Sequence, residues 1–175
     1  LAFGEAGLVT LFTLISVHAL ILLTGATVVF ELAAAREQHG DAARHLAGYL
    51  AAFALTIDRP VPGTWEIAEA LLARGVPMYA ITNWSADTWP HALELYPRLT
   101  ALFGDIVVSG QVRQLKPEPA IYRLLMDRNG LSPQDCIFID DSLANVEGAR
   151  ALGMDGIHFT GAGALARELT LRGLF

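Results

Sequence analysis

Short apolar runs alternate with amphipathic stretches over the last two-thirds of the chain. Four of these runs have the length of a strand and predict buried strands: 78–82, 106–109, 136–140 and 156–160. The intervening stretches predict helices: 64–74, 85–96, 118–128, 144–151 and a tail that begins at residue 164. Helices that alternate with strands in this way predict an α/β protein with a Rossmann-like parallel sheet flanked by helices.

The N-terminal part follows a different pattern. Residues 7–30 contain no charged side chain, and a run of this length is long enough to span a bilayer as a helix. Three interpretations stay open: a membrane anchor, a buried segment of helix plus strand, or sequence from a truncated or disrupted gene. Beyond it, alanine-rich sequence with spaced charges predicts two helices at 28–38 and 41–55.

Composition narrows the classes of partner and compartment. The length of 175 residues fits one domain with a proper core, and the net charge of -6 argues against a nucleic-acid partner. The single cysteine, Cys136, excludes an internal disulfide and fits a reducing compartment. We therefore expect a cytoplasmic protein, with membrane attachment through residues 7–30 as the alternative. The oligomeric state is not indicated.

Polar residues follow three of the predicted strands where each one ends. They form the pairs Thr82-Asn83, Ser109-Gly110 and Asp140-Asp141. The carboxyl ends of parallel strands share one edge of a sheet, and open α/β sheets bind their ligands at that edge. The sequence therefore predicts a ligand site there.

The acidic pair Asp140-Asp141 indicates a metal site. Two adjacent carboxylates that close an apolar strand are costly to bury unless a positive charge compensates them. Mg²⁺ is a common solution, held by one or two carboxylates together with phosphate oxygens and water. The alternative is a helix N-cap formed by Asp141 or Ser142, and the two roles are compatible. Asn145 is expected one turn into the following helix, facing back toward the site.

Two further positions suit a phosphoryl group. Thr82 and Asn83 offer a hydroxyl and an amide as hydrogen-bond donors at a strand end, although such residues alone are most often turn formers. Lys116 lies beside the predicted start of a helix, where a cation is not favoured electrostatically. We therefore expect an anionic group close to Lys116.

The order of these motifs resembles the phosphatase-type members of the haloacid dehalogenase-like hydrolase superfamily. Thr82 in YAITNWS matches the second motif of that family, Lys116 in GQVRQLKPEPAIY the third, and Asp140 and Asp141 in FIDDSLANVEGARALGM the fourth. The resemblance implies that Thr82 and Lys116 are catalytic, that they bind phosphate together with Asn83, and that Asp140 and Asp141 hold Mg²⁺. It also implies a small phosphorylated metabolite as substrate, rather than a haloacid.

The resemblance also suggests how the chain is divided. It covers residues 61–175 as the α/β core, and residues 26–60 loosely resemble the end of a helical cap. Residues 1–25 form an apolar segment of uncertain status.

The first motif of the family is missing from its expected place. That motif is an apolar strand followed by Asp-x-Asp, whose first aspartate attacks phosphorus to form an aspartyl-phosphate. No such pattern precedes Thr82, where the only acidic residues are Glu5, Glu31, Glu37, Asp41, Asp58, Glu66 and Glu69. Glu31 follows the strand-like run TVVF but lacks a second acid, and we expect it in a cap helix.

Three hypotheses follow from the missing motif. The chain is a Mg²⁺-dependent phosphatase that is impaired in catalysis, a non-catalytic or truncated remnant that binds Mg²⁺ or phosphate, or a membrane-anchored interaction module.

Overall fold

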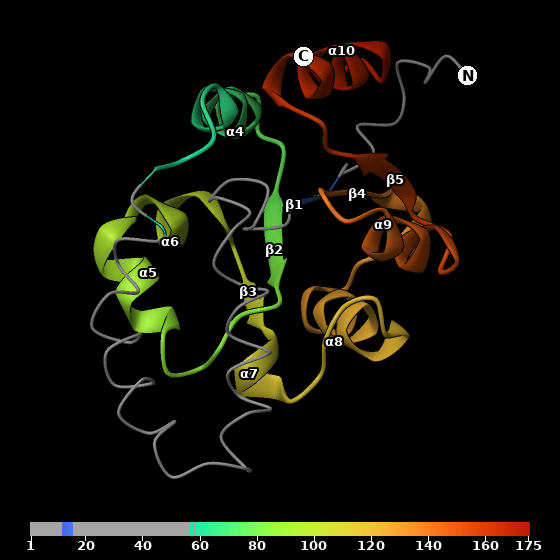
Figure 1. The fold of residues 1–175 in the computed structure, drawn as a ribbon. Coiled ribbons are helices and arrows are strands. Elements are labelled where there is room, and N and C mark those ends of the chain that lie inside the picture. The colour runs from blue at the N-terminus through green and yellow to red at the C-terminus, as the bar shows by residue number, and fades with distance from the viewer. Residues whose placement is uncertain (1–11, 16–56, 58) are drawn as a thin grey trace, which may run out of the picture.

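The computed structural model describes the backbone of residues 12–15 together with residues 57 and 59–175 (Figure 1). The five strands of the described part are β1 (Phe12–Ile15), β2 (Met78–Thr82), β3 (Ile106–Val108), β4 (Cys136–Asp140) and β5 (Asp155–His158). They form one sheet in the order β3-β2-β1-β4-β5, and every neighbouring pair is parallel. The parallel α/β sheet predicted from the sequence is thereby confirmed.

Helices cover both faces of this sheet. The helices of the described part are α4 (Thr64–Ala73), α5 (Trp89–Leu95), α6 (Arg98–Leu102), α7 (Ser109–Val112), α8 (Pro119–Asn129), α9 (Leu143–Arg150) and α10 (Ala162–Leu171), with a 3₁₀ turn at Pro133–Asp135. Side chains of α4, α5, α6 and α10 belong to one core cluster, and those of α8 and α9 to the other. The result is three layers, with the sheet in the middle (Figure 1).

The alternation of side chains along the strands explains the two cores. In β4, Ile137 and Ile139 belong to the cluster on the α4 side, whereas Cys136 and Phe138 belong to the cluster on the α8 side. Successive side chains of a strand point to opposite faces, so a strand buried on both faces reads as a continuous apolar run. This is why the runs 78–82 and 136–140 were recognisable, and both strands have the predicted bounds.

The central strand comes from the uncharged N-terminal run. β1 pairs with β2 on one side and with β4 on the other, with Thr13 opposite both Met78 and Ile137. The pairing of residues 12–15 is compatible with a buried segment of helix plus strand, and the choice among the three interpretations of the whole run stays a prediction. The predicted cap helices at 28–38 and 41–55, and Glu31, lie outside the described residues. Within the described part, no helix has the length and apolar character needed to cross a membrane.

The prediction of a helix over 85–96 with Ser85 as its N-cap was wrong at its start. The helix α5 begins at Trp89, immediately before Pro90. Proline has no backbone N–H and fits only the first turn of a helix, so Pro90 fixes the start of α5. Ser85 instead closes a turn, because its hydroxyl oxygen accepts the N–H of Asp87 at 3.2 Å. The short helix α6, which follows Pro97, was not predicted.

Candidate active site

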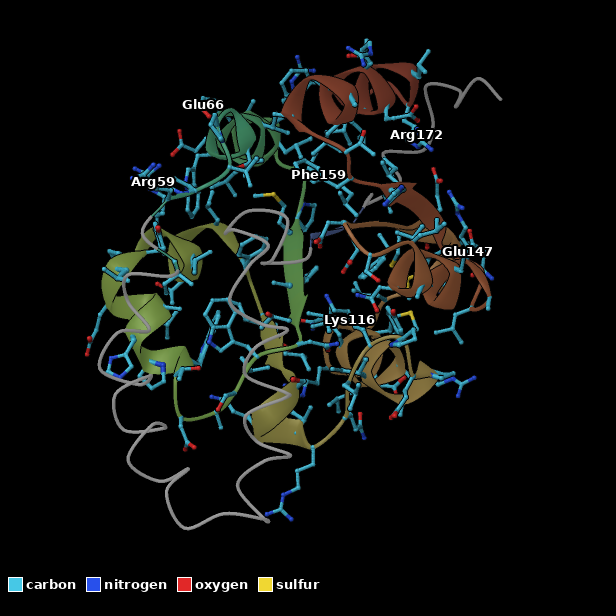
Figure 2. All side chains as sticks on the ribbon, in the orientation of Figure 1. Arg59, Glu66, Lys116, Glu147, Phe159 and Arg172 are labelled. Carbon is cyan, nitrogen blue, oxygen red and sulfur yellow. The ribbon has the colours of Figure 1, made fainter. Side chains whose placement is uncertain are left out.

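The predicted site residues lie together at the carboxyl edge of the sheet. Thr82 ends β2 and Asp140 ends β4, and Lys116 lies in the connection between α7 and α8. All three are buried, with exposed fractions of 0% for Thr82, 2% for Lys116 and 1% for Asp140. Figure 2 shows Lys116 near the carboxyl end of β2, on the side of α8. The parallel sheet thus brings residues far apart in the sequence to one edge.

Lys116 and Asp140 form a buried ion pair. The ammonium Nζ donates to Asp140 Oδ2 at 2.7 Å and to the carbonyl oxygen of Ile81 at 3.0 Å. Burial lowers the pKa of Lys116, and the charge of the Asp140 carboxylate opposes that shift. The anionic partner that the sequence led us to expect near Lys116 is therefore Asp140.

The second oxygen of Asp140 is also engaged by the protein. Oδ1 accepts the backbone N–H of Ser142 at 2.8 Å and the side-chain amide of Asn145 at 3.0 Å. Burial alone raises the pKa of Asp140, but the charge and hydrogen bond of Lys116, with the bonds from Ser142 and Asn145, hold it below its usual value. Asn145 faces back toward the site as predicted.

Asp141 has a different environment from its neighbour. It is half-buried, and burial together with the negative charge of Asp140 raises its pKa. Its backbone carbonyl oxygen lies 2.9 Å from Nε2 of His158 at the end of β5. Ser142 occupies the N-cap of α9, yet Asp140 rather than Asp141 accepts its N–H. Asp141 is thus a partly buried carboxylate beside a second negative charge.

These carboxylates fit a magnesium ion with few protein ligands. No group of three or more His, Cys, Asp or Glu side chains suited to a metal occurs in the described part of the chain. Mg²⁺ is commonly bound through one or two carboxylates and completes its shell with water and phosphate oxygens. Because both oxygens of Asp140 already accept hydrogen bonds, Asp141 has the carboxylate better placed to gain from a cation.

The side chain of Asn83 contacts the main chain of Lys116. Its Nδ2 donates to the carbonyl oxygen of Lys116 at 2.9 Å, and its Oδ1 accepts the N–H of Lys116 at 2.9 Å. The next residue, Trp84, is joined to Ser109, since the N–H of Trp84 donates to the Ser109 hydroxyl at 2.9 Å. The residues that follow β2 are therefore hydrogen-bonded directly to the residue that follows β3.

The sequence did not point to Tyr122, which supports the site from α8. Its hydroxyl donates to the carbonyl oxygen of Asn145 at 2.8 Å, and its ring packs edge-on against Phe138. The signal in the sequence that could have identified Tyr122 is a tyrosine on the apolar face of a helix, because a buried phenol needs a hydrogen-bond partner.

The helices α8 and α9 are also in close contact where α8 begins. Gly148 of α9 lies so close to Pro117 that an added Cβ would come within 2.8 Å of the Pro117 carbonyl oxygen.

The structure thus brings together all five of the predicted site residues. Thr82 and Asn83 follow one another at the end of β2, Lys116 contacts Asn83 and Asp140, and Asp141 follows Asp140. The catalytic, phosphate-binding and metal-binding roles assigned to them stay predictions.

Three curated relatives match between 57% and 66% of the chain. The chain is 33% identical over 112 residues to flavin mononucleotide hydrolase 1 of Arabidopsis thaliana, a match that covers 64% of this chain and 45% of the relative. It is 31% identical over 119 residues to bifunctional epoxide hydrolase 2 of Rattus norvegicus, covering 66% and 21%. It is 30% identical over 101 residues to phosphoglycolate phosphatase of Escherichia coli K12, covering 57% and 39%. These matches span less than half the length of each relative.

Solved structures share the fold at low sequence identity. A HAD-family enzyme of Bacteroides thetaiotaomicron, in complex with magnesium and inorganic phosphate, superposes with a TM-score of 0.64 at 20% identity over 86% of this chain and 94% of that one. A hydrolase from Streptococcus pneumoniae gives a TM-score of 0.63 at 19% identity, covering 91% and 98%.

A family model decides the classification. The model of the haloacid dehalogenase-like hydrolases matches residues 6–153, which include β1 as well as the three motifs at the sheet edge. The chain therefore belongs to the haloacid dehalogenase-like hydrolase family.

Proposed function

We propose that this edge of the sheet binds Mg²⁺ and small phosphate esters, and that the chain is a phosphatase-type hydrolase with impaired turnover. The observation that carries the proposal is the buried Lys116–Asp140 pair with the half-buried Asp141 beside it. Such a cluster of charges is costly without a function. The names of two relatives, a flavin mononucleotide hydrolase and a phosphoglycolate phosphatase, support a phosphate ester as substrate.

The residues divide the work of phosphate binding between them. The Lys116 ammonium neutralises negative charge on the phosphoryl oxygens, and the Thr82 hydroxyl donates a hydrogen bond to one of them. Asp140 keeps the ammonium in place, and Asp141 takes the larger part in holding the cation. When bound, Mg²⁺ supplies further neutralisation of charge on the phosphoryl group.

The impairment follows from the sequence around β1. In the family, the attacking aspartate follows the first strand directly. Here Ile15 pairs with Ile139, and the residue after Ile139 is Asp140. The residue after Ile15 is Ser16, with His18 two positions later, so neither position of an Asp-x-Asp motif holds an aspartate. Both residues lie outside the described part of the chain. Loss of a covalent nucleophile costs several orders of magnitude in rate.

One set of measurements tests both parts of the proposal. Calorimetry with Mg²⁺ and inorganic phosphate measures binding, and hydrolysis of p-nitrophenyl phosphate measures turnover. The chain is compared with an Asp140→Asn/Asp141→Asn variant and with a Ser16→Asp/His18→Asp variant. We expect the unaltered chain to bind phosphate but to hydrolyse the ester no faster than the Asp140→Asn/Asp141→Asn variant. The restored aspartates should raise the rate by at least about 100-fold.

The outcomes separate the hypotheses. Absence of phosphate binding by the unaltered chain, in the presence of Mg²⁺, sinks the proposed function. Mg²⁺-dependent hydrolysis by the unaltered chain, well above that of the Asp140→Asn/Asp141→Asn variant, shows instead that its turnover is intact.

A further inference from the structure

Lys116 owes its place to a segment with little regular structure. It lies between α7 and α8, in neither helix nor strand, yet its ammonium is fixed between Asp140 and the carbonyl oxygen of Ile81. A long side chain loses much rotamer freedom on burial, and an error in its backbone position would carry the charge away from the phosphoryl group. The backbone of residue 116 therefore has to be held from outside its own segment.

Asn83 provides this connection. Both polar groups of its side-chain amide bond the main chain of Lys116, one as donor and one as acceptor, at 2.9 Å each. The two bonds close a ring of the kind that adjacent strands make, and they fix both the position and the orientation of the peptide. A turn-forming asparagine would bond its own neighbours, whereas Asn83 bonds a residue far away in the sequence.

The other end of the same segment is also fixed to the residues that follow β2. Ser109 accepts the N–H of Trp84 at 2.9 Å and donates to the Trp84 carbonyl oxygen at 3.3 Å. Gly110 approaches so closely that its N–H donates to the same carbonyl at 3.0 Å. Two successive residues after β2, Asn83 and Trp84, therefore hold the two ends of the segment that carries Lys116.

We propose that Asn83 is a positioning residue, which holds the Lys116 main chain so that the ammonium stays between Asp140 and the end of β2. The effect of this placement on phosphate binding rests on the proposed function, whereas the placement of Lys116 itself does not. The role differs from the phosphate-binding role that the motif suggests, and it uses one N–H of the amide and the carbonyl oxygen.

The composition of the chain offers a direct probe of this placement. Lys116 is the only lysine among the 175 residues. Acetylation by acetic anhydride, followed by mass spectrometry of the peptide that contains Lys116, therefore reports on this one side chain. A buried ammonium that is bonded to a carboxylate reacts slowly, because it must first leave its partner and reach the solvent.

Three variants define the experiment. Asn83→Ala removes both bonds, and Asn83→Asp keeps the acceptor for the Lys116 N–H but loses the donor. Asn129→Ala is the matched control, because Asn129 is also half-buried and its amide also bonds a main-chain carbonyl, that of Leu125 at 2.9 Å. All rates are measured under native conditions, with the unfolding midpoint of each variant determined alongside.

Two lost hydrogen bonds predict acetylation of Lys116 about 10-fold to 100-fold faster in Asn83→Ala than in the unaltered chain. Asn83→Asp should give an intermediate rate, and Asn129→Ala should leave the rate unchanged. Equal rates in Asn83→Ala and the unaltered chain overturn the proposal, as does an equal acceleration in Asn129→Ala. If Asn83→Ala does not fold, the comparison of Asn83→Asp with Asn129→Ala decides by the same criteria. The readout needs neither phosphate binding nor turnover, so failure of the proposed function leaves it intact.

Discussion

At the scale of single residues, the site is built around one buried ion pair. Lys116 and Asp140 are almost fully removed from solvent, and each has further hydrogen bonds besides the 2.7 Å contact between them. Burial of two charges costs free energy that their attraction and hydrogen bonds must offset. The intact pair therefore adds little to the free energy of unfolding, whereas removal of one partner alone would be strongly destabilising.

Breaking the pair from one side should destabilise the fold strongly. Lys116→Met leaves the Asp140 carboxylate buried without its cation, and we expect a loss of about 3–5 kcal/mol in the free energy of unfolding. A Lys116→Met/Asp140→Asn variant removes both charges and should recover most of that loss. Equilibrium unfolding in urea measures both values. A loss below about 1 kcal/mol in the single variant contradicts the burial of the pair.

The pair also predicts how stability depends on pH. The pKa of Asp140 is lower in the folded than in the unfolded chain, so its contribution is present above the unfolded value of about 4 and is lost as the pH falls. The difference in unfolding free energy between the unaltered chain and Asp140→Asn should therefore narrow on acidification from about pH 5. Urea titrations across this range measure it. A difference that stays constant contradicts the assignment.

At the scale of elements, the sequence predicted buried strands better than helix starts. The runs 78–82 and 136–140 are apolar throughout because both faces of the sheet are covered, and this pattern marks their bounds. Ser85 looked like an N-cap because capping chemistry and turn chemistry use the same side chain. Pro90 decides between the two roles, because it restricts where the first turn of α5 can form.

The close contact between α7 and the segment that follows β2 predicts how a substitution of Gly110, the second residue of α7, affects stability. A Cβ there would lie 2.5 Å from the backbone nitrogen of Ala86 and 2.8 Å from the carbonyl oxygen of Trp84. Because backbone atoms cannot move aside cheaply, Gly110→Ala should destabilise the protein by about 1–3 kcal/mol.

The matched control, Gly163→Ala, should change the stability in the opposite direction. Gly163 lies within α10, and the atom nearest to its added Cβ is the end of the Arg167 side chain at 3.9 Å. Gly163→Ala should therefore stabilise by about 0.5–1 kcal/mol through helix propensity. Thermal unfolding measures both variants, and a neutral Gly110→Ala would show that the two strand ends are not in close contact.

At the scale of the whole molecule, the sequence predicted the sheet and the order of the site motifs but not the central strand. Nothing within the uncharged run 7–30 marks Phe12–Ile15, because the partners that select these residues, β2 and β4, lie far along the chain. The site shows the same limit. Residue types at strand ends predicted which side chains meet, whereas the bond of Asn83 depends on how a distant connecting segment is placed, and that of Tyr122 on how α8 lies beside α9.

Ligand binding should stabilise the whole fold. A ligand at about 100 times its Kd adds about 2.7 kcal/mol to the stability, which corresponds to a rise of about 5–10 °C in Tm for a chain of this size. We expect this rise with Mg²⁺ and inorganic phosphate together, measured by differential scanning fluorimetry.

Asp141→Asn is the control for that rise. Without ligands it should melt above the unaltered chain, because it removes a carboxylate whose pKa is raised by burial and by the charge of Asp140. It should then gain little from Mg²⁺ and phosphate. An equal gain in both proteins contradicts the assignment of Asp141 to the cation.

The middle position of β1 in the sheet also affects how the chain can fold during its synthesis. Phe12 pairs with Cys136, so β1 is flanked on one side by a strand that is synthesised much later than β1 itself. At ordinary rates of translation this interval is roughly 6–25 s, during which an apolar strand waits on the ribosome without its neighbour. Pairing across so much of the chain also closes a large loop and slows folding. The nascent chain is therefore most exposed to aggregation before β4 emerges, and chaperone demand should be greatest in that interval.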